Sequence, residues 1–221
     1  MSAPLVPKTI VLVLLSACLL SCAPDRSDDD AIRAEVTQMA QDFLALREMQ
    51  GFPHELPLDE AYRWQDEFVS VLSASLGDIA GYKTGGHDPG PGFPTFPPAG
   101  IRATILAGMI LPSGTAVERA DSVWGFLEAD FALRVGSASI NEAQSDLEIL
   151  AGLDAVVPFA EIPDPYYEQG TRTVNGTVVA NMSSRFAFAG EPVPVSYTHL
   201  TLPTSSVMCG CGWGGEGEWG G

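Results

Sequence analysis

The sequence predicts a mixed α/β (α+β) domain in which N-terminal helices precede a β-sheet. Apolar residues recur at helical spacing between positions 32 and 46 and again between positions 62 and 72. Positions 126–135 alternate with a period of two, which indicates a half-buried strand, and positions 154–162 form a short apolar run that is typical of a buried strand. The 221 residues, 46% of them hydrophobic, are enough for one domain with its own core.

Two helices are expected first. The inward face of the first helix, which ends near residues 51–53, consists of Ile32, Val36, Met39, Phe43 and Leu46. The second helix is expected to have Asp59 as its N-cap and to end at residues 77–78. Its inward face consists of Tyr62, Gln65, Phe68, Val69 and Leu72. His54, in the connecting loop, is expected to be an ordinary surface residue.

The middle of the chain is less regular. Residues 81–85 predict a short strand that enters a glycine turn, and the prolines and glycines of residues 87–98 predict a loop. Residues 101–111 are apolar, and their periodicity fits either a helix or a strand. Asn141 is expected to cap a third helix that runs to Leu153 with its leucines facing inward.

The last part of the domain predicts more β-structure. Asn175 and Gly176 form the strongest hairpin-turn pattern in the sequence, within residues 172–179. Residues 186–190 predict another strand.

Three carboxylates lie on the two central predicted strands. Glu128 and Asp130 are one strand repeat apart, so they share a face, and their repulsion needs solvent or a divalent cation to compensate it. From the pattern alone, a solvated face is the commoner explanation. Glu161 lies near the end of an apolar run, where a carboxylate is costly unless it is paired or ligates something. Three carboxylates on two strands suit a hard cation such as Mg²⁺ or Mn²⁺.

The charge of the chain is strongly acidic. The formal net charge is −17, and only 11 residues are Lys or Arg. This balance argues against nucleic-acid binding, because a protein that binds phosphates needs a basic surface.

The N-terminus is typical of an exported protein. Lys8 precedes an apolar run that is too short for a comfortable membrane span and matches the hydrophobic part of a signal peptide. The residues before Cys18 and Cys22 both resemble bacterial lipobox sequences. We expect residues 1–21 to be the signal peptide, Cys22 (alternatively Cys18) to carry the lipid, and residues 22–30 to be an acidic tether. The protein would then be a lipoprotein of the cell envelope that faces the periplasm; an ordinary cleaved signal peptide and secretion are the alternative.

The C-terminus does not resemble a natural domain end. Residues 195–204 resemble the translation of a transposon-type sequencing adapter, and the remaining residues are of low complexity. Cys209 and Cys211, two residues apart without further ligands, are a weak metal-site pattern. We therefore expect residues 195–221 to be non-native and residues 31–194 to form the domain.

Several ordered segments resemble one family. They read GYKTG at 81–85, LEADF at 127–131 and AVVPFAEI at 155–162, with AYRWQ at 61–65 and NMSS at 181–184 as further landmarks. In this order they resemble the 2-keto-4-pentenoate hydratase branch of the fumarylacetoacetate hydrolase superfamily. The resemblance covers roughly residues 31–194. It implies a strongly curved, barrel-like mixed sheet after the helices.

The resemblance also implies an activity. It implies a metal-dependent lyase, which acts on a small 2-oxo acid by hydration or C–C cleavage. Mg²⁺ or Mn²⁺ would be held by Glu128, Asp130 and Glu161. Lys83 would hold an acidic group of the substrate, and Ser183 or Ser184 would face it.

The chain departs from the family in three places. Residues 98–100 read Pro-Ala-Gly, where the family often has an acidic residue before the glycine, and Asp130 replaces the more usual Glu. The family also continues with further strands and a helix beyond Pro194, which would close the sheet. These departures keep a second function open, a catalytically silent envelope lipoprotein that binds a small acidic ligand. An envelope domain of unrelated fold and a homo-oligomer also remain open.

Overall fold

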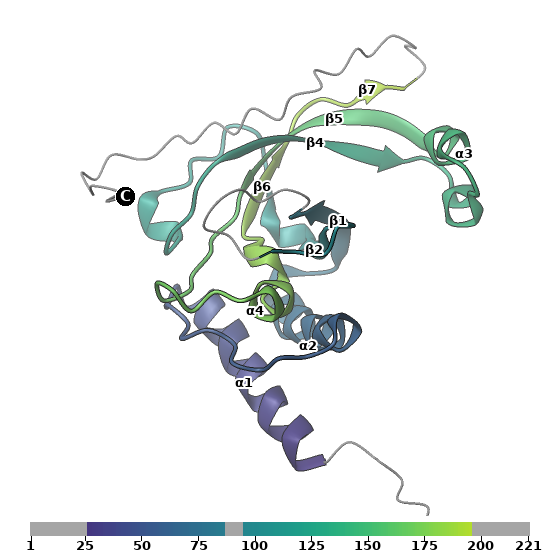
Figure 1. Cartoon of the computed structure of the whole chain (residues 1–221). Helices are drawn as coiled ribbons and strands as arrows, with labels where there is room; N and C mark the ends of the chain where they lie inside the picture. Colours follow the sequence, from purple (N-terminus) through teal and green to yellow (C-terminus); the bar gives the residue numbers. More distant parts are fainter. Residues whose placement is uncertain (1–25, 87–94, 196–221) are drawn as a thin grey trace, which may run out of the picture.

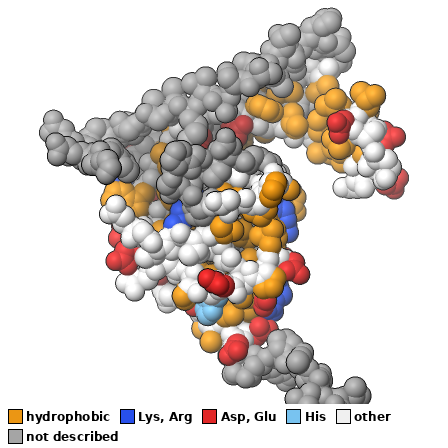
Figure 2. All heavy atoms as spheres, in the orientation of Figure 1, with side chains coloured by type: hydrophobic (Ala, Val, Ile, Leu, Met, Phe, Trp, Pro, Cys, Tyr) orange, Lys and Arg blue, Asp and Glu red, His pale blue; other side chains and the backbone are white. Residues whose placement is uncertain are grey.

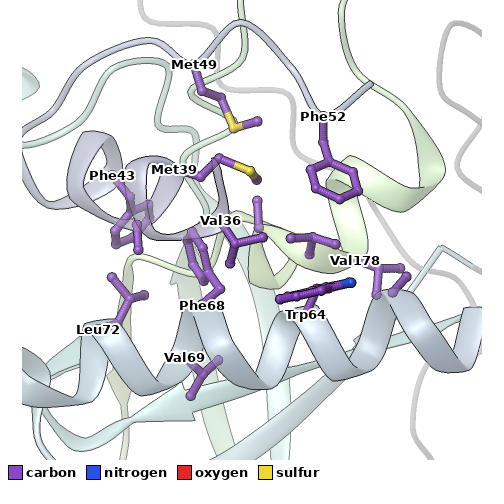
Figure 3. Packing of buried hydrophobic residues seen from close by; sticks show 14 of the residues in the cluster. Val36, Met39, Phe43, Met49, Phe52, Trp64, Phe68, Val69, Leu72 and Val178 are labelled. Atoms are coloured by element: carbon purple, nitrogen blue, oxygen red, sulfur yellow. The ribbon is translucent and has the colours of Figure 1, made fainter. Parts of the chain in front are cut away.

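The computed structural model describes residues 26–86 and 95–195 (Figure 1). Two long helices, α1 (Arg26–Leu44) and α2 (Leu58–Leu76), lie side by side below the strands. In Figure 3, Val36, Met39 and Phe43 of α1 point toward Trp64, Phe68 and Leu72 of α2. The helical spacing therefore predicted this core correctly, except at Leu46: α1 ends at Leu44, short of the expected 51–53, and Leu46 is 38% exposed.

The ends of these helices differ from the expectation. Helix α1 begins inside the predicted acidic tether, where Arg63 of α2 holds the Asp29 carboxylate at 3.1 Å. The N-cap of α2 is Pro57 and not Asp59, which lies in the first helical turn. A carboxylate is favourable in either place because it faces the positive end of the helix dipole. His54 is partly accessible; its Nε2 lies 2.8 Å from Glu35 Oε2, and its ring lies 4.8 Å from the Phe52 ring at a tilted angle.

Two sheets lie over the helices. Strands β1 (Ile79–Gly85) and β2 (Ile101–Leu106) form an antiparallel pair. Residues 101–111 are thus mainly extended: a single 3₁₀ turn (Ala107–Met109) connects β2 to β3 (Ile110–Leu111). The buried faces of β2 and α2 are joined by Gln65, which donates to the carbonyl of Arg102 at 3.0 Å.

The larger sheet contains five strands. Its order is β3-β6-β5-β4, with β7 (Val193–Pro194) also paired to β5. The other bounds are β4 Glu128–Val135, β5 Leu153–Ile162 and β6 Phe186–Ala189. The strands pair antiparallel, except that β3 and β6 are parallel. Neither sheet closes on itself within residues 26–86 and 95–195, so the barrel-like curvature that the resemblance implies is not seen there.

Strand β4 is not half-buried as its alternation predicted. Its apolar face stays exposed, with 48% of Phe131, 50% of Leu133 and 56% of Val135 accessible to solvent. Strands β4 and β5 extend away from the helices as an arm that carries α3 at its tip (Figure 1). The alternation located the strand correctly but did not identify what would cover it.

The expected third helix is shorter and begins later than predicted. Helix α3 spans only Asp146–Ala151 and is capped by Ser145, while Asn141 lies in a 3₁₀ turn (Ala138–Glu142). Leu147 is 79% exposed, so the expectation of an inward leucine face was wrong. Residue Leu153 already belongs to β5.

The expected Asn-Gly hairpin is a helix. Helix α4 (Val174–Val179) begins at Thr173, whose side chain accepts a hydrogen bond from the Gly176 N–H at 2.9 Å. Asn175 donates from its side chain to the carbonyl of Leu56 at 2.8 Å. The hairpin prediction failed because a Thr N-cap and burial of the two valines in the core favour the helix over a turn.

Most of the predictions for the two chain ends concern residues that the structure does not describe. Cys18, Cys22 and residues 196–221 are among them. The expected boundary residue Val195 is included, and its N–H donates to the carbonyl of Asp154 at 3.0 Å. Among the helices that are described, none is long and apolar enough to cross a membrane.

Candidate active site

Strand pairing brings the three predicted carboxylates to one face of the large sheet. Glu128 of β4 lies directly opposite Glu161 of β5. Asp130 follows two residues along β4, so it shares this face with Glu128. Like charges placed directly opposite each other repel, and the arrangement therefore needs a compensating positive charge.

Lys83 of β1 supplies part of that charge. Its Nζ donates to Glu161 Oε1 at 2.5 Å, and only 5% of Glu161 is exposed. The buried carboxylate near the end of the apolar run is therefore paired, as its burial requires. Lys83 was expected to meet an acidic group of the substrate, and in the protein alone it meets an acidic side chain.

The other two carboxylates are less well compensated. Burial raises the pKa of Glu128, and the nearby Glu161 and Asp130 raise it further, while Lys83 and Arg172 act in the opposite direction. Asp130 Oδ1 accepts a hydrogen bond from the backbone N–H of Phe131 at 2.7 Å. Within the described ranges, no three His, Cys, Asp or Glu side chains stand close enough together to hold a metal ion. Coordination by all three carboxylates would require their side chains to turn.

A cavity of about 240 Å³ adjoins these residues. Its charged and polar lining includes Lys83, Glu128, Asp130, Glu161, Arg172 and Thr177. Phe96, Ile101, Phe126 and Met182 form apolar parts of the lining. The cavity therefore combines two cationic and three acidic side chains with apolar parts of the wall.

Arg172 is the residue of this cavity that the sequence reasoning missed. Its Nε donates to Thr177 Oγ1 at 3.2 Å, and its guanidinium lies 5.9 Å from the Tyr167 ring. Burial lowers the pKa of Arg172, whereas Tyr167 and Glu128 raise it. The neighbouring Thr173 could have revealed the position, because an N-cap Thr marks a helix start and not a hairpin strand.

The two predicted serines do not line the cavity. Ser183 is 2% exposed and Ser184 is 3% exposed, and Met182 lies at the cavity in their place. The chain reaches this arrangement through three consecutive left-handed residues, with φ of 54° at Asn181, 49° at Met182 and 58° at Ser183. Such a run is costly for residues other than glycine and needs support from its surroundings.

Asn181 provides that support. Its Oδ1 accepts from the Thr104 N–H at 2.7 Å, and its Nδ2 donates to the Thr104 carbonyl at 2.8 Å. Both residues are buried, so the side-chain amide occupies the place of a neighbouring strand beside β2. The left-handed turn that carries Met182 to the cavity is thus fixed to the small sheet.

We expect Asn181→Ala to lower the free energy of unfolding by about 2 kcal/mol, because two buried backbone groups of Thr104 lose their partners. Urea unfolding measures the loss. Asn141→Ala, at an exposed position, is the matched control and should change little. Asn181→Gly separates the causes, since glycine tolerates the left-handed backbone but cannot bind Thr104. Wild-type stability in Asn181→Gly would show that the hydrogen bonds contribute nothing.

The fold, two helices packed beneath mixed β-sheets, is a mixed α/β fold that is also found in an enzyme of known structure. A solved structure of 4-oxalocrotonate decarboxylase from Pseudomonas putida G7, complexed with magnesium and adipate, is similar with a TM-score of 0.62 and 19% identity. The same enzyme complexed with calcium and acetate is similar with a TM-score of 0.59 and 19% identity. Each match covers 76% of this chain and 65% of the decarboxylase chain. No protein-family model and no curated protein matches the sequence.

Proposed function

We propose that the protein is a divalent-metal-dependent enzyme that acts on a small 2-oxo acid, by hydration or by cleavage of a C–C bond, as in the 2-keto-4-pentenoate hydratases. The observation that carries this proposal is the placement of Glu128 opposite Glu161, with Asp130 beside them, at a cavity that also contains Lys83 and Arg172. The similar decarboxylase structures hold magnesium with adipate and calcium with acetate, which supports a cation and a carboxylic acid in this fold.

The three carboxylates fit a hard cation chemically. Carboxylate oxygens are the ligands that Mg²⁺ and Mn²⁺ prefer. Burial is the first cause of the raised pKa of Glu128, and the nearby Glu161 and Asp130 add to it; a cation would relieve this repulsion. Glu128, Asp130 and Glu161 would hold the ion. When bound, it would polarise the 2-oxo group and stabilise negative charge that develops on the substrate.

The side chains around the carboxylates would bind and orient the substrate. The Lys83 ammonium has three N–H donors and uses one on Glu161, so another can hold the substrate carboxylate. Phe96, Ile101 and Met182 would contact the carbon chain and keep water from it. Ser183 and Ser184 would reach the substrate only if the left-handed turn changed its conformation.

A turnover assay tests the proposal. We expect 2-oxo acids with a vinyl group to be converted in the presence of Mg²⁺ or Mn²⁺, and conversion to stop when a chelator is added. Lys83→Met should raise KM, because it removes the cation that holds the substrate carboxylate. Arg47→Met changes a surface cation that does not line the cavity and should leave turnover unchanged. Conversion that survives both the chelator and Lys83→Met would refute the proposal.

A second function is favoured by one local feature. Residues 98–100 lack an acidic side chain and form a tight turn, in which the Gly100 N–H donates to the Pro97 carbonyl at 2.7 Å. The general acid or base that the family often has there is thus replaced by a compact turn. A protein that binds the same 2-oxo acids without converting them is therefore the alternative, and calorimetric binding without turnover would support it.

A further inference from the structure

Lys83 and Glu161 form a largely buried ion pair in the wall of the cavity. The Lys83 Nζ donates to Glu161 Oε1 at 2.5 Å, and the two side chains are 14% and 6% exposed. A buried charge of either sign is costly without a partner, so each side chain needs the other as long as nothing else enters the cavity. In the protein alone, Lys83 is therefore committed to Glu161.

The charges that line the cavity oppose the binding of an organic acid. Two cationic side chains, Lys83 and Arg172, stand against three carboxylates, so the lining has one negative charge in excess when all five groups are ionised. The whole protein is also acidic, with 28 Asp and Glu residues and only 11 Lys and Arg. On the face shown in Figure 2, red acidic side chains are more widespread than blue basic ones. An anion is therefore repelled unless positive charge is added to the cavity.

A divalent cation on the three carboxylates would change this balance in two ways. It would turn the one excess negative charge of the lining into one excess positive charge. It would also compete with Lys83, because Glu161 has a single carboxylate and the ammonium already donates to it. An ammonium that leaves Glu161 is a largely buried charge that needs a new anionic partner.

We propose that Lys83 couples the binding of the divalent cation to the binding of the substrate. Lys83 is released when the cation takes Glu161, and it then pairs with the carboxylate of the 2-oxo acid. This inference rests on the proposed function and adds cooperativity to it: the cation-free cavity has little affinity for the acid. Because linked binding is reciprocal, the acid must strengthen the binding of the cation by the same factor.

Glu161→Gln is the sharpest test, because this variant should bind the acid without any cation. It removes the charge that holds Lys83. In a chelating buffer, calorimetry should show that 2-oxopentanoate, which has no double bond to hydrate, binds Glu161→Gln about tenfold more tightly than the wild type. Glu128→Gln is the matched control: it removes the same charge from the cavity, leaves the pair of Lys83 with Glu161 in place and should gain much less. Equal gains in the two variants, or no gain in Glu161→Gln, would overturn the proposal.

A binding cycle with Mn²⁺ tests the coupling itself. In the wild type, saturating Mn²⁺ should strengthen the binding of 2-oxopentanoate about a hundredfold, in part through direct attraction between opposite charges. Lys83→Met should reduce this coupling about tenfold, because no ammonium is released. Arg172→Met removes a cavity cation whose Nε donates to the Thr177 hydroxyl, so it should weaken the acid equally with and without Mn²⁺ and keep the wild-type coupling.

Failure of the coupling and failure of the proposed function give different results in this cycle. Wild-type coupling in Lys83→Met would refute the role of Lys83 alone, since Mn²⁺ and the acid would still bind together. A wild-type protein that binds neither Mn²⁺ nor 2-oxopentanoate would overturn both proposals.

Discussion

Replacing Asp164 with alanine is expected to lower the free energy of unfolding by about 3–5 kcal/mol, because it leaves a buried guanidinium without its partner. Asp164 is fully buried, and its Oδ2 accepts from Arg185 Nε at 2.5 Å. Arg185 also donates to the Phe43 carbonyl at 2.8 Å, and its guanidinium lies 3.8 Å from the Phe43 ring. Burial lowers the pKa of Arg185, and Asp164 is the main group that raises it, so removing Asp164 takes away most of what favours the charged guanidinium.

Asp164 also fixes the segment that leads into β4. Its carboxylate accepts from the backbone N–H groups of Val123 at 3.0 Å and Trp124 at 2.7 Å. The alanine variant should therefore loosen the entry to Glu128 as well as the core. Denaturant unfolding followed by Trp fluorescence measures both effects.

Two further variants make the test of Asp164 specific. Asp154→Ala removes one partner of an exposed ion pair, with 52% and 48% of the two side chains accessible, and should cost far less. The double variant Asp164→Leu, Arg185→Met replaces the buried pair with apolar groups and should recover part of the stability. An equal loss of unfolding free energy in Asp164→Ala and Asp154→Ala would show that burial of the Asp164–Arg185 pair does not matter.

Removing a carboxylate from the candidate metal site is expected to weaken Mn²⁺ binding by about a hundredfold, judged from the known sensitivity of metal sites to their surroundings. Glu128→Gln and Glu161→Gln keep the size of the side chain and remove its charge. The amide oxygen introduced at position 161 can still accept from Lys83, so the fold should survive. Calorimetric titration of Mn²⁺ into each variant measures the change.

A variant of Lys83 makes the Mn²⁺ titration more specific for these carboxylates. Since its Nζ occupies Glu161 Oε1, it competes with a cation for the same carboxylate. Lys83→Met should therefore raise the Mn²⁺ affinity while it impairs substrate binding. Glu142→Gln, in the exposed 3₁₀ turn before α3, is the control and should bind Mn²⁺ like the wild type. Equal affinity in all variants would mean that Glu128 and Glu161 form only a charged surface.

The parts of the fold that the sequence predicted are those with long, regular patterns. Helices α1 and α2 each have 19 residues and one apolar face, and β5 is a ten-residue apolar strand. The errors lie in short elements, where a single local contact decides the outcome. Thr173 and Ser145 each cap a six-residue helix, and one capping hydrogen bond outweighs the turn propensity of Asn175 and Gly176.

In the candidate site, too, the local sequence pattern was predictive, whereas contacts between residues far apart in the sequence were not predicted. The period of two predicted that Glu128 and Asp130 share one face of the strand, and the strand pairing agrees with this prediction. The contact of Lys83 with Glu161 joins residues 78 positions apart, and no periodicity in the sequence reports it. The resemblance brought Lys83 and Glu161 to one site but gave them separate roles. Arg172 was missed because its neighbours were interpreted as a hairpin.

The left-handed turn at Asn181 has a consequence for the rate at which the protein unfolds. The two hydrogen bonds between Asn181 and Thr104 join residues that are 77 positions apart, whereas the α1–α2 contacts join neighbouring helices. Closing a loop of this length costs conformational entropy, so we expect these hydrogen bonds to form late, after the folding transition state. Weakening the hydrogen bonds between Asn181 and Thr104 should therefore speed unfolding and leave the folding rate almost unchanged. Asn181 would then determine the unfolding rate, and so the lifetime of the native state.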